Sequence, residues 1–128
     1  LLNVRLAHMR EITEERRQLA ENYSRSLCSK DIILPKEREG TFAVWHQYVI
    51  RTRRRRELIE YLNEKEIGTI IHYPIPPHLS EAYSVLGNKK GDFPITEEYA
   101  DTVLSIPLYS GMKEEEQQFT IECINSFA

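Results

Sequence analysis

Two histidines and a tyrosine stand in one short proline-rich segment, Ile71-His72-Tyr73-Pro74-Ile75-Pro76-Pro77-His78. Its prolines fix φ and remove backbone donors, so the segment predicts a stiff bend rather than a helix or a central strand. It follows a strand-like run, and loops at strand ends are where binding groups concentrate. Histidine can donate to phosphate or sugar hydroxyls, and tyrosine can stack on a ring or donate its hydroxyl. A structural turn with a packed tyrosine explains these residues equally well, so both interpretations stay open from the chemistry alone.

A run of four arginines, Arg53 to Arg56, is the second feature with possible chemistry. Its cations suit a phosphate or RNA contact, and they oppose the dipole of a helix that begins there. However, Glu57 and Glu60 stand four residues after Arg53 and Arg56 and can pair with them along a helix. Because no aromatic stacking platform accompanies the run and the net charge is −3, an ion-paired helix surface is favoured. We expect no nucleic-acid partner.

The remaining candidate groups give no recognisable metal or catalytic pattern. His46, His72 and His78 match no structural zinc spacing, and no cysteine joins them. Cys28 and Cys123 lie far apart, as is typical of reduced cysteines in a cytoplasmic protein. The sequence holds no Gly-rich phosphate loop, no Ser/His/Asp array and no paired carboxylate motif. We therefore expect no metal site.

Length and composition allow one small domain. The chain has 128 residues, of which 41% are hydrophobic and 29% charged, so a buried core within a solvated shell is feasible. No apolar run approaches the roughly 20 residues of a membrane helix, and we expect no membrane partner. The first residue is Leu1 and a helical pattern already runs there. This leads us to expect a fragment whose missing upstream part carries function.

The first residues predict one long helix, because apolar side chains recur at steps of three and four from Leu2 to Leu27 with charges between them. About 25 residues of helix would span about 38 Å, which suits a bridge between two domains. We therefore divide the chain into an interdomain helix, residues 1–28, and a small domain, residues 29–128.

The small domain is predicted to be α+β. Alternating side chains rich in β-branched and aromatic types predict strands over 41–52, 69–73 and 104–108. Helical periodicity, caps and first-turn residues predict helices over 53–66, 79–86, 97–103 and 113–127. The order α-β-α-β-α-α-β-α with strands this short predicts a three-stranded sheet packed on one side by helices.

Several motifs, in order, resemble the C-terminal part of sugar aminotransferases of the DegT/StrS family. They are Val44-Trp45-His46-Gln47-Tyr48-Val49-Ile50-Arg51, Arg56-Glu57-Leu58 with Leu62, Gly68-Thr69-Ile70-Ile71-His72-Tyr73-Pro74 with Pro76 and His78, Gly91-Asp92-Phe93-Pro94-Ile95-Thr96-Glu97 with Ala100, and Leu104-Ser105-Ile106-Pro107-Leu108-Tyr109 with Met112. The first helix, with Arg16, Ala20, Tyr23 and Leu27, is similar to the family's interdomain helix. The resemblance covers nearly the whole chain, and ordered motifs together are far more specific than any one of them.

The resemblance implies the small C-terminal domain of a fold-type-I transferase. In this family a large upstream domain, absent here, binds pyridoxal phosphate through a Schiff-base lysine, and the small domain closes over the substrate. The reaction moves an amino group from glutamate to a keto group of a nucleotide-linked sugar, for cell-surface polysaccharides or antibiotic sugars, with the cofactor as electron sink. Such enzymes are implied to be cytoplasmic homodimers with sites at the subunit interface. The motif Pro74-Ile75-Pro76-Pro77-His78 favours a dTDP-linked 3-keto-6-deoxyhexose as the substrate.

The resemblance also assigns residues. The family's His-Tyr segment lies near the nucleotide-sugar site, so His72 and Tyr73, and in second place His78, are implied to bind substrate by positioning and hydrogen bonding. None of the lysines matches the family's cofactor-lysine motif, so we expect no catalytic and no cofactor-binding residue, no bound cofactor and no transaminase activity in this chain alone. The family's usual glycine before Ile67 is replaced by Glu66, which predicts a strained helix end with positive φ.

Two other functions stay open beside the transferase. A stand-alone α+β module could bind a ligand at the proline bend and signal through the long helix. The upstream reading frame separates the two, because a cofactor lysine followed by a Gly-rich stretch supports the transferase. An RNA-binding domain would use Arg53 to Arg56, and salt-dependent RNA binding lost on changing them would favour it.

Overall fold

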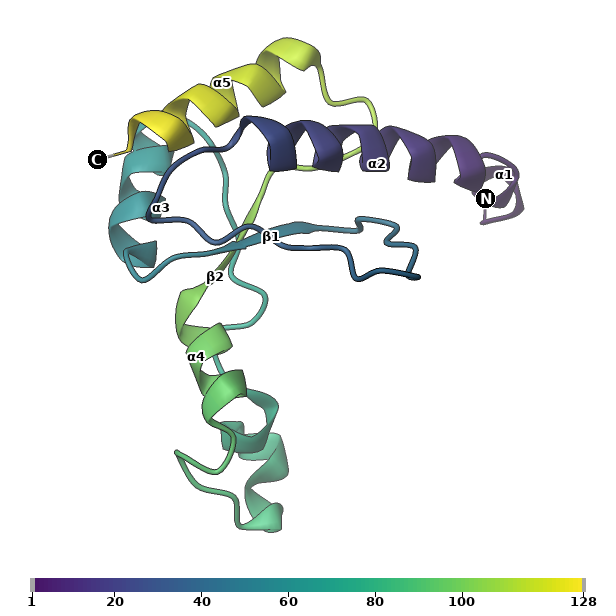
Figure 1. Cartoon of the computed structure of the whole chain (residues 1–128). Helices are drawn as coiled ribbons and strands as arrows, with labels where there is room; N and C mark the ends of the chain where they lie inside the picture. The colour runs from purple at the N-terminus through teal and green to yellow at the C-terminus, as the bar shows by residue number, and fades with distance from the viewer. Residues whose placement is uncertain (1, 128) are drawn as a thin grey trace.

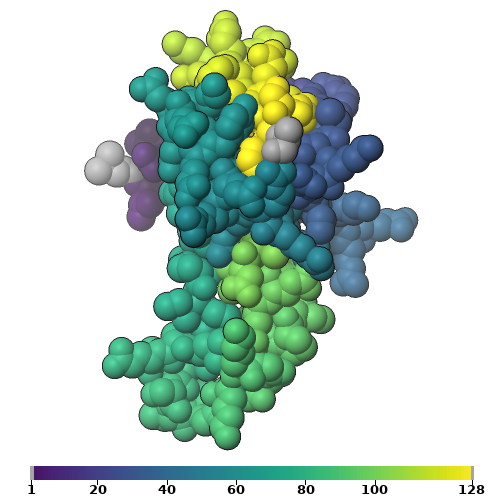
Figure 2. Space-filling view, turned by 90° about the vertical axis from the view of Figure 1, so that its left-hand side faces the viewer, coloured from purple at the N-terminus to yellow at the C-terminus, as the bar shows by residue number. Residues whose placement is uncertain are grey.

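Helices α2 (Met9–Ser26) and α5 (Glu114–Ser126) lie side by side over a small sheet in the computed structural model, which describes residues 2–127 (Figure 1). Helix α3 (Arg55–Glu64) packs against α5 at one end of the sheet. On the other side of the sheet, residues 72–102 form a projection that we call the arm. It holds the 3-10 turns η1 (Pro77–Leu79) and η2 (Glu81–Leu86) and helix α4 (Pro94–Thr102), and Figure 2 shows it extending below the helical body.

The sheet has two strands and not the three that the sequence predicts. Strands β1 (Tyr48–Arg51) and β2 (Val103–Ile106) are antiparallel, with Tyr48 opposite Ile106. The predicted strand over 69–73 contributes a single bridge, between Ile70 and Ser105. Its pairing goes no further because the prolines that follow cannot donate ladder hydrogen bonds and turn the chain into the arm. On the opposite edge, Ile33 bridges Arg51.

The strand predicted over 41–52 is also shorter, and it begins only at Tyr48. Trp45 has a φ of 46°, which lies outside the extended region, so the stretch before it cannot join the ladder. The predicted positive φ before Ile67 is confirmed, since Glu66 has a φ of 60°. The Thr52 hydroxyl accepts a hydrogen bond from the Arg54 backbone N–H at 3.1 Å, but its predicted position as the helix cap is wrong, because α3 begins after Arg54 and Arg54 is its N-cap.

The other helices differ from prediction in extent or type. The single N-terminal helix is interrupted at His8, which separates α1 (Leu2–Ala7) from α2. The helix predicted over 79–86 is a pair of 3-10 turns. Helix α4 starts three residues before the predicted 97, because Pro94 fits the first turn of a helix, where no backbone N–H is needed.

The core lies between the sheet and helices α2, α3 and α5. Its largest fully buried side chains are Tyr23, Tyr48, Ile50, Leu58, Leu62, Leu104 and Ile124. The Tyr23 and Tyr48 rings lie 5.1 Å apart between centroids, and the Tyr23 hydroxyl donates to the Pro107 carbonyl at 2.8 Å. Burial raises the pKa of the Tyr23 phenol, so the group stays a neutral donor. The α+β class is confirmed, with a smaller sheet than predicted.

Candidate functional site

The proline bend leaves the edge of β2 and brings His72 beside Ser105. The backbones of Ile70 and Ser105 exchange two hydrogen bonds, of 2.8 and 3.1 Å, which sets the register of the bend against β2. His72 follows two residues later on the chain, and its Nδ1 lies 2.9 Å from Ser105 Oγ and 3.1 Å from Gln47 Nε2. Gln47 directly precedes β1. Three segments distant in sequence therefore meet at one imidazole nitrogen.

His72 and Tyr73 line an open cavity of about 470 Å³ between the bend and helix α4. Tyr73 is 73% exposed, and its ring meets the edge of the His72 ring with 5.4 Å between centroids. The other walls are mainly proline, aliphatic and aromatic side chains, among them Tyr83 and Tyr99. An apolar wall with a few placed polar groups is what a ring-bearing ligand requires. The structure thus places both His72 and Tyr73 in the lining of one cavity, and their binding of substrate stays a prediction.

His78 is placed differently. Its side chain is only 8% exposed, and its Nε2 lies 3.0 Å from Glu97 Oε1. The Phe93 ring packs against the imidazole at 4.8 Å between centroids. Glu97 also accepts from the Gly91 backbone N–H at 2.7 Å, and this bond first, then that of His78, holds the pKa of the carboxyl below its ordinary value. His78 therefore ties η1 to the start of α4, and it lies outside the lining of the His72 cavity.

Three arginines of the predicted run form contacts within the chain. Arg54 forms ion pairs with Asp31 at 3.0 Å and with Glu57 at 2.7 Å. The predicted pair of Arg56 and Glu60 is confirmed at 3.0 Å, whereas Glu57 pairs with Arg54 and not with Arg53. The Arg55 guanidinium donates to backbone carbonyl oxygens at the end of α4, those of Ala100 and Val103. Most of the run is thus engaged within the molecule.

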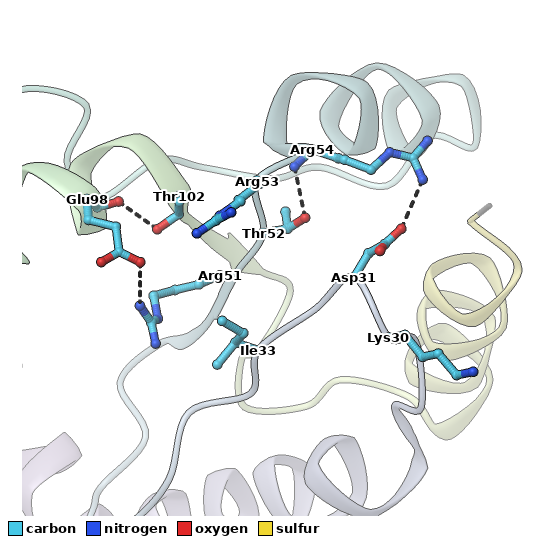
Figure 3. A pocket seen from close by; sticks show the side chains of 9 residues that line it. All are labelled: Lys30, Asp31, Ile33, Arg51, Thr52, Arg53, Arg54, Glu98 and Thr102. Carbon is cyan, nitrogen blue, oxygen red and sulfur yellow. Dashed lines mark hydrogen bonds and ion pairs between the residues drawn. The ribbon is translucent and has the colours of Figure 1, made fainter.

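A second cavity, of about 300 Å³, lies beside this run (Figure 3). Its cationic lining residues are Lys30, Arg51, Arg53 and Arg54. Arg51 lies 3.6 Å from Glu98, and Arg54 is already paired. Figure 3 shows Arg53 directed towards Glu98 while Lys30 points away from the cavity. The cations therefore do not converge on one point, and the cavity lacks the geometry of a built anion site.

The lysines of this chain do not fit a cofactor attachment site. A Schiff-base lysine is activated by desolvation in an apolar pocket or by a neighbouring cation. Every lysine here is exposed, namely Lys30, Lys36, Lys65, Lys89, Lys90 and Lys113. None of them lines the cavity beside His72 and Tyr73. The residues present therefore do not hold pyridoxal phosphate covalently, and no step through that group is derived from them.

Two further kinds of site are absent from the part of the chain that the structure describes. Across residues 2–127, no three His, Cys, Asp or Glu side chains gather in a way that would hold a metal ion. Over the same residues, no helix has both the length and the apolar character needed to cross a membrane.

Comparison with known proteins identifies the family. The model of the DegT/DnrJ/EryC1/StrS aminotransferase family matches residues 1–125. The chain belongs to the DegT/DnrJ/EryC1/StrS aminotransferase family. The family resemblance of the sequence motifs is thereby confirmed.

Relatives in this family are much longer than the chain. A pleiotropic regulatory protein of Geobacillus stearothermophilus is 39% identical over 99% of this chain and 35% of its own length. A dTDP-3-amino-3,6-dideoxy-alpha-D-galactopyranose transaminase of Aneurinibacillus thermoaerophilus is 34% identical over 99% of this chain and 34% of its own length. The chain thus spans about a third of the curated relatives it matches.

Solved members of the family share the fold. The structure of DesV from S. venezuelae in complex with a ketimine intermediate has a TM-score of 0.93 and 35% identity, over 97% of this chain and 34% of that one. NtdA of Bacillus subtilis, solved with bound cofactor PMP, has a TM-score of 0.76 and 29% identity, over 88% of this chain and 27% of that one. The two-stranded sheet and its helices are therefore the fold of one portion of these aminotransferases.

Sequence reasoning missed Gln47 and Ser105 as partners of His72. Ser105 did leave a signal, because it is a lone hydroxyl between Leu104 and Ile106 in an apolar strand, and a buried polar group requires a hydrogen-bond partner. Gln47 left no such signal, since an amide before a strand is ordinary at a surface. Both residues contact His72, and only the pairing of the bend with β2 brings His72 beside them.

Proposed function

We propose that this chain is the C-terminal small domain of a pyridoxal-phosphate-dependent transaminase that moves an amino group from glutamate to a dTDP-linked keto sugar, with a 3-keto-6-deoxyhexose as the favoured substrate. Family membership and the dTDP-sugar transaminase among the relatives support the activity. The observation that carries the role of this domain is the cavity lined by His72 and Tyr73, which offers a donor, an exposed phenol and apolar walls. When bound elsewhere in the enzyme, the cofactor supplies the electron sink for transamination.

The residues of the bend bind and orient the sugar nucleotide. The exposed Tyr73 ring can stack on a ring of the ligand, and the His72 imidazole can hydrogen-bond a polar atom beside it. Direct contact by His78 stays a prediction. Its buried bond to Glu97 supports a contribution through the position of the bend and the arm.

The N-terminal helices are proposed to pack against the large domain, as an interdomain element, in a cytoplasmic homodimer. Leu2 and Leu6 are 84% and 70% exposed, and Met9 is 46% exposed, although all three belong to the apolar stripe that predicted the helix. Further along the same stripe, Ala20 and Tyr23 are buried in the core of this chain. Exposed apolar side chains in line with a buried stripe are typical of a surface that packs against another part of the enzyme.

Transamination of dTDP-linked 3-keto-6-deoxyhexoses with glutamate tests the proposal. We expect turnover by the full-length enzyme and none by the 128-residue chain, because its lysines are exposed and match no attachment motif. Changing Tyr73→Ala in the full-length enzyme should raise KM for the sugar nucleotide, by about tenfold if stacking contributes roughly 1–1.5 kcal/mol. Turnover by the 128-residue chain alone, or a Tyr73→Ala enzyme with unchanged KM, would contradict the assignment.

One observation favours a second candidate function. The relative with 39% identity is a pleiotropic regulatory protein, which is compatible with a ligand-binding or regulatory module. The protein sequence preceding this chain in its gene separates the two candidates. A lysine followed by a Gly-rich stretch there supports the transaminase, and its absence supports the regulatory module.

A further inference from the structure

Two side chains that can donate a hydrogen bond lie beside the Nδ1 atom of His72. Gln47 Nε2, at 3.1 Å, belongs to an amide –NH2 group that can only donate. An imidazole nitrogen that receives this bond must carry a lone pair and no proton. The Ser105 hydroxyl, at 2.9 Å from the same nitrogen, then also donates, because Nδ1 has no proton to give.

We propose that Gln47 and Ser105 are positioning residues that hold neutral His72 as the tautomer protonated on Nε2. A neutral imidazole carries one N–H, so a lone pair on Nδ1 places the proton on Nε2. The His72 side chain lines the cavity beside Tyr73, and Nε2 has no hydrogen-bond partner within residues 2–127. His72 therefore presents a donor, and selects an acceptor oxygen, on a ligand in that cavity. The identity of this ligand rests on the proposed function.

Both positioning residues are themselves held in place. Ser105 is 7% exposed, pairs with Val49 within the sheet and exchanges two backbone hydrogen bonds with Ile70. A buried hydroxyl needs a partner, and His72 Nδ1 supplies it. Both sequence neighbours of Gln47 are fixed. Tyr48 is buried, and the backbone carbonyl of His46 accepts a hydrogen bond of 2.7 Å from Arg16 Nη1 on α2. A rigid supporting shell of this kind fixes the donor direction before the ligand arrives.

The arrangement predicts which ligand groups are selected. An Nε2–H donor pairs with a keto, hydroxyl or phosphate oxygen of a sugar nucleotide, and it disfavours an ammonium group, which has no acceptor. A keto sugar therefore fits the cavity better than its amino product at the position that faces His72. This gives His72 a part in substrate selection that does not require proton transfer.

The tautomer is measured directly by 15N NMR of selectively histidine-labelled full-length enzyme without substrate. The two ring nitrogens differ strongly in 15N shift according to which one carries the proton. We expect the Nε2–H form for His72, and the Nδ1–H form in a Gln47→Glu variant, because a carboxylate is an acceptor and draws the proton to Nδ1. An Nδ1–H form in the unchanged enzyme, or no tautomer change in Gln47→Glu, overturns the inference whether or not the enzyme is a transaminase.

Kinetics then connect the tautomer to binding. Gln47→Glu should raise KM for the keto-sugar nucleotide about tenfold with little change in kcat, because an acceptor then faces an acceptor oxygen. Ser105→Ala should keep the Nε2–H tautomer, because Gln47 still donates to Nδ1, and should raise KM about threefold through loss of the hydroxyl hydrogen bond that orients the ring. In a His72→Ala background, Gln47→Glu should have no further effect on KM. An equal effect in both backgrounds would assign Gln47 a merely structural role and overturn the inference.

Two further measurements distinguish the outcomes. Inhibition by dTDP alone should weaken in Gln47→Glu if the accepted oxygen belongs to a phosphate, and stay unchanged if it belongs to the sugar. Gln18→Glu on the exposed face of α2 is the matched control for added charge, and it should alter neither the tautomer nor KM. If the tautomer switches as inferred but no sugar nucleotide binds, the positioning of His72 stands and the proposed substrate class falls.

Discussion

The helical body and the arm of this domain are stabilised in different ways. The body contains every fully buried large side chain of the described chain, with Leu58, Leu62 and Ile124 among them. The arm, residues 72–102, instead exposes large apolar groups such as Val85 and Ile95, which are 90% and 71% exposed. Its internal connections include the polar bond between His78 and Glu97, with the Phe93 ring packed against the imidazole. The body therefore folds around a core, while the arm depends on a few hydrogen bonds and leaves apolar surface for another molecule or domain to cover.

The largest effect that tests this difference comes from truncating the core. Leu62→Ala should lower the free energy of unfolding by about 2–5 kcal/mol, because a fully buried leucine leaves a cavity. The matched change in the arm, Leu86→Ala, should cost less than about 0.5 kcal/mol, since Leu86 is 64% exposed. Urea unfolding followed by circular dichroism measures both. Similar losses at the two positions would show that the arm has a core of its own.

A smaller effect is expected where the two regions are tied together. Arg55→Ala should cost about 1–3 kcal/mol, because it removes charge-assisted hydrogen bonds to the carbonyl oxygens of Ala100 and Val103 at the end of α4. Arg53→Ala is the matched control within the same run, and as an exposed residue it should stay within about 0.5 kcal/mol. Urea titration of the two variants distinguishes them. An equal response would mean that Arg55 does not join the body to the arm.

The smallest effect is a pH-dependent opening of the arm. The hydrogen bonds from Gly91 and His78 lower the pKa of Glu97 from its ordinary value of 4.5. A carboxyl whose pKa is lowered in the folded state stabilises that state above its unfolded pKa, and this contribution is lost as the pH falls through the folded pKa. Amide hydrogen exchange around Gly91 should therefore increase below about pH 4.5, before the body unfolds.

The control for this prediction removes the carboxylate. Glu97→Gln should raise amide exchange around Gly91 already at neutral pH and should remove its acid dependence. If amide exchange rises in the arm and in the body at the same pH, the hydrogen bonds of Glu97 do not stabilise the arm separately from the body.

Local features of this protein were readable from its sequence. The positive φ of Glu66 and the pair of Arg56 and Glu60 involve residues within a few positions of one another. The geometry of a helix or a turn fixes such neighbours, so residue type and spacing suffice to predict them. The bend at His72 and Tyr73 was predictable for the same reason, because proline restricts the backbone locally.

Partnerships across the fold were decided by the tertiary structure. His72 meets Ser105 across 33 residues and Gln47 across 25, and Arg55 reaches Ala100 across 45. The strand at 69–73 is reduced to one bridge because the arm begins there, which its alternating residues do not reveal. Period-2 and helical patterns specify which face of an element is buried, but not which distant group it meets. The sequence by itself therefore determined the α+β class, the family and the bend, whereas only packing placed Gln47 and Ser105 beside one imidazole nitrogen.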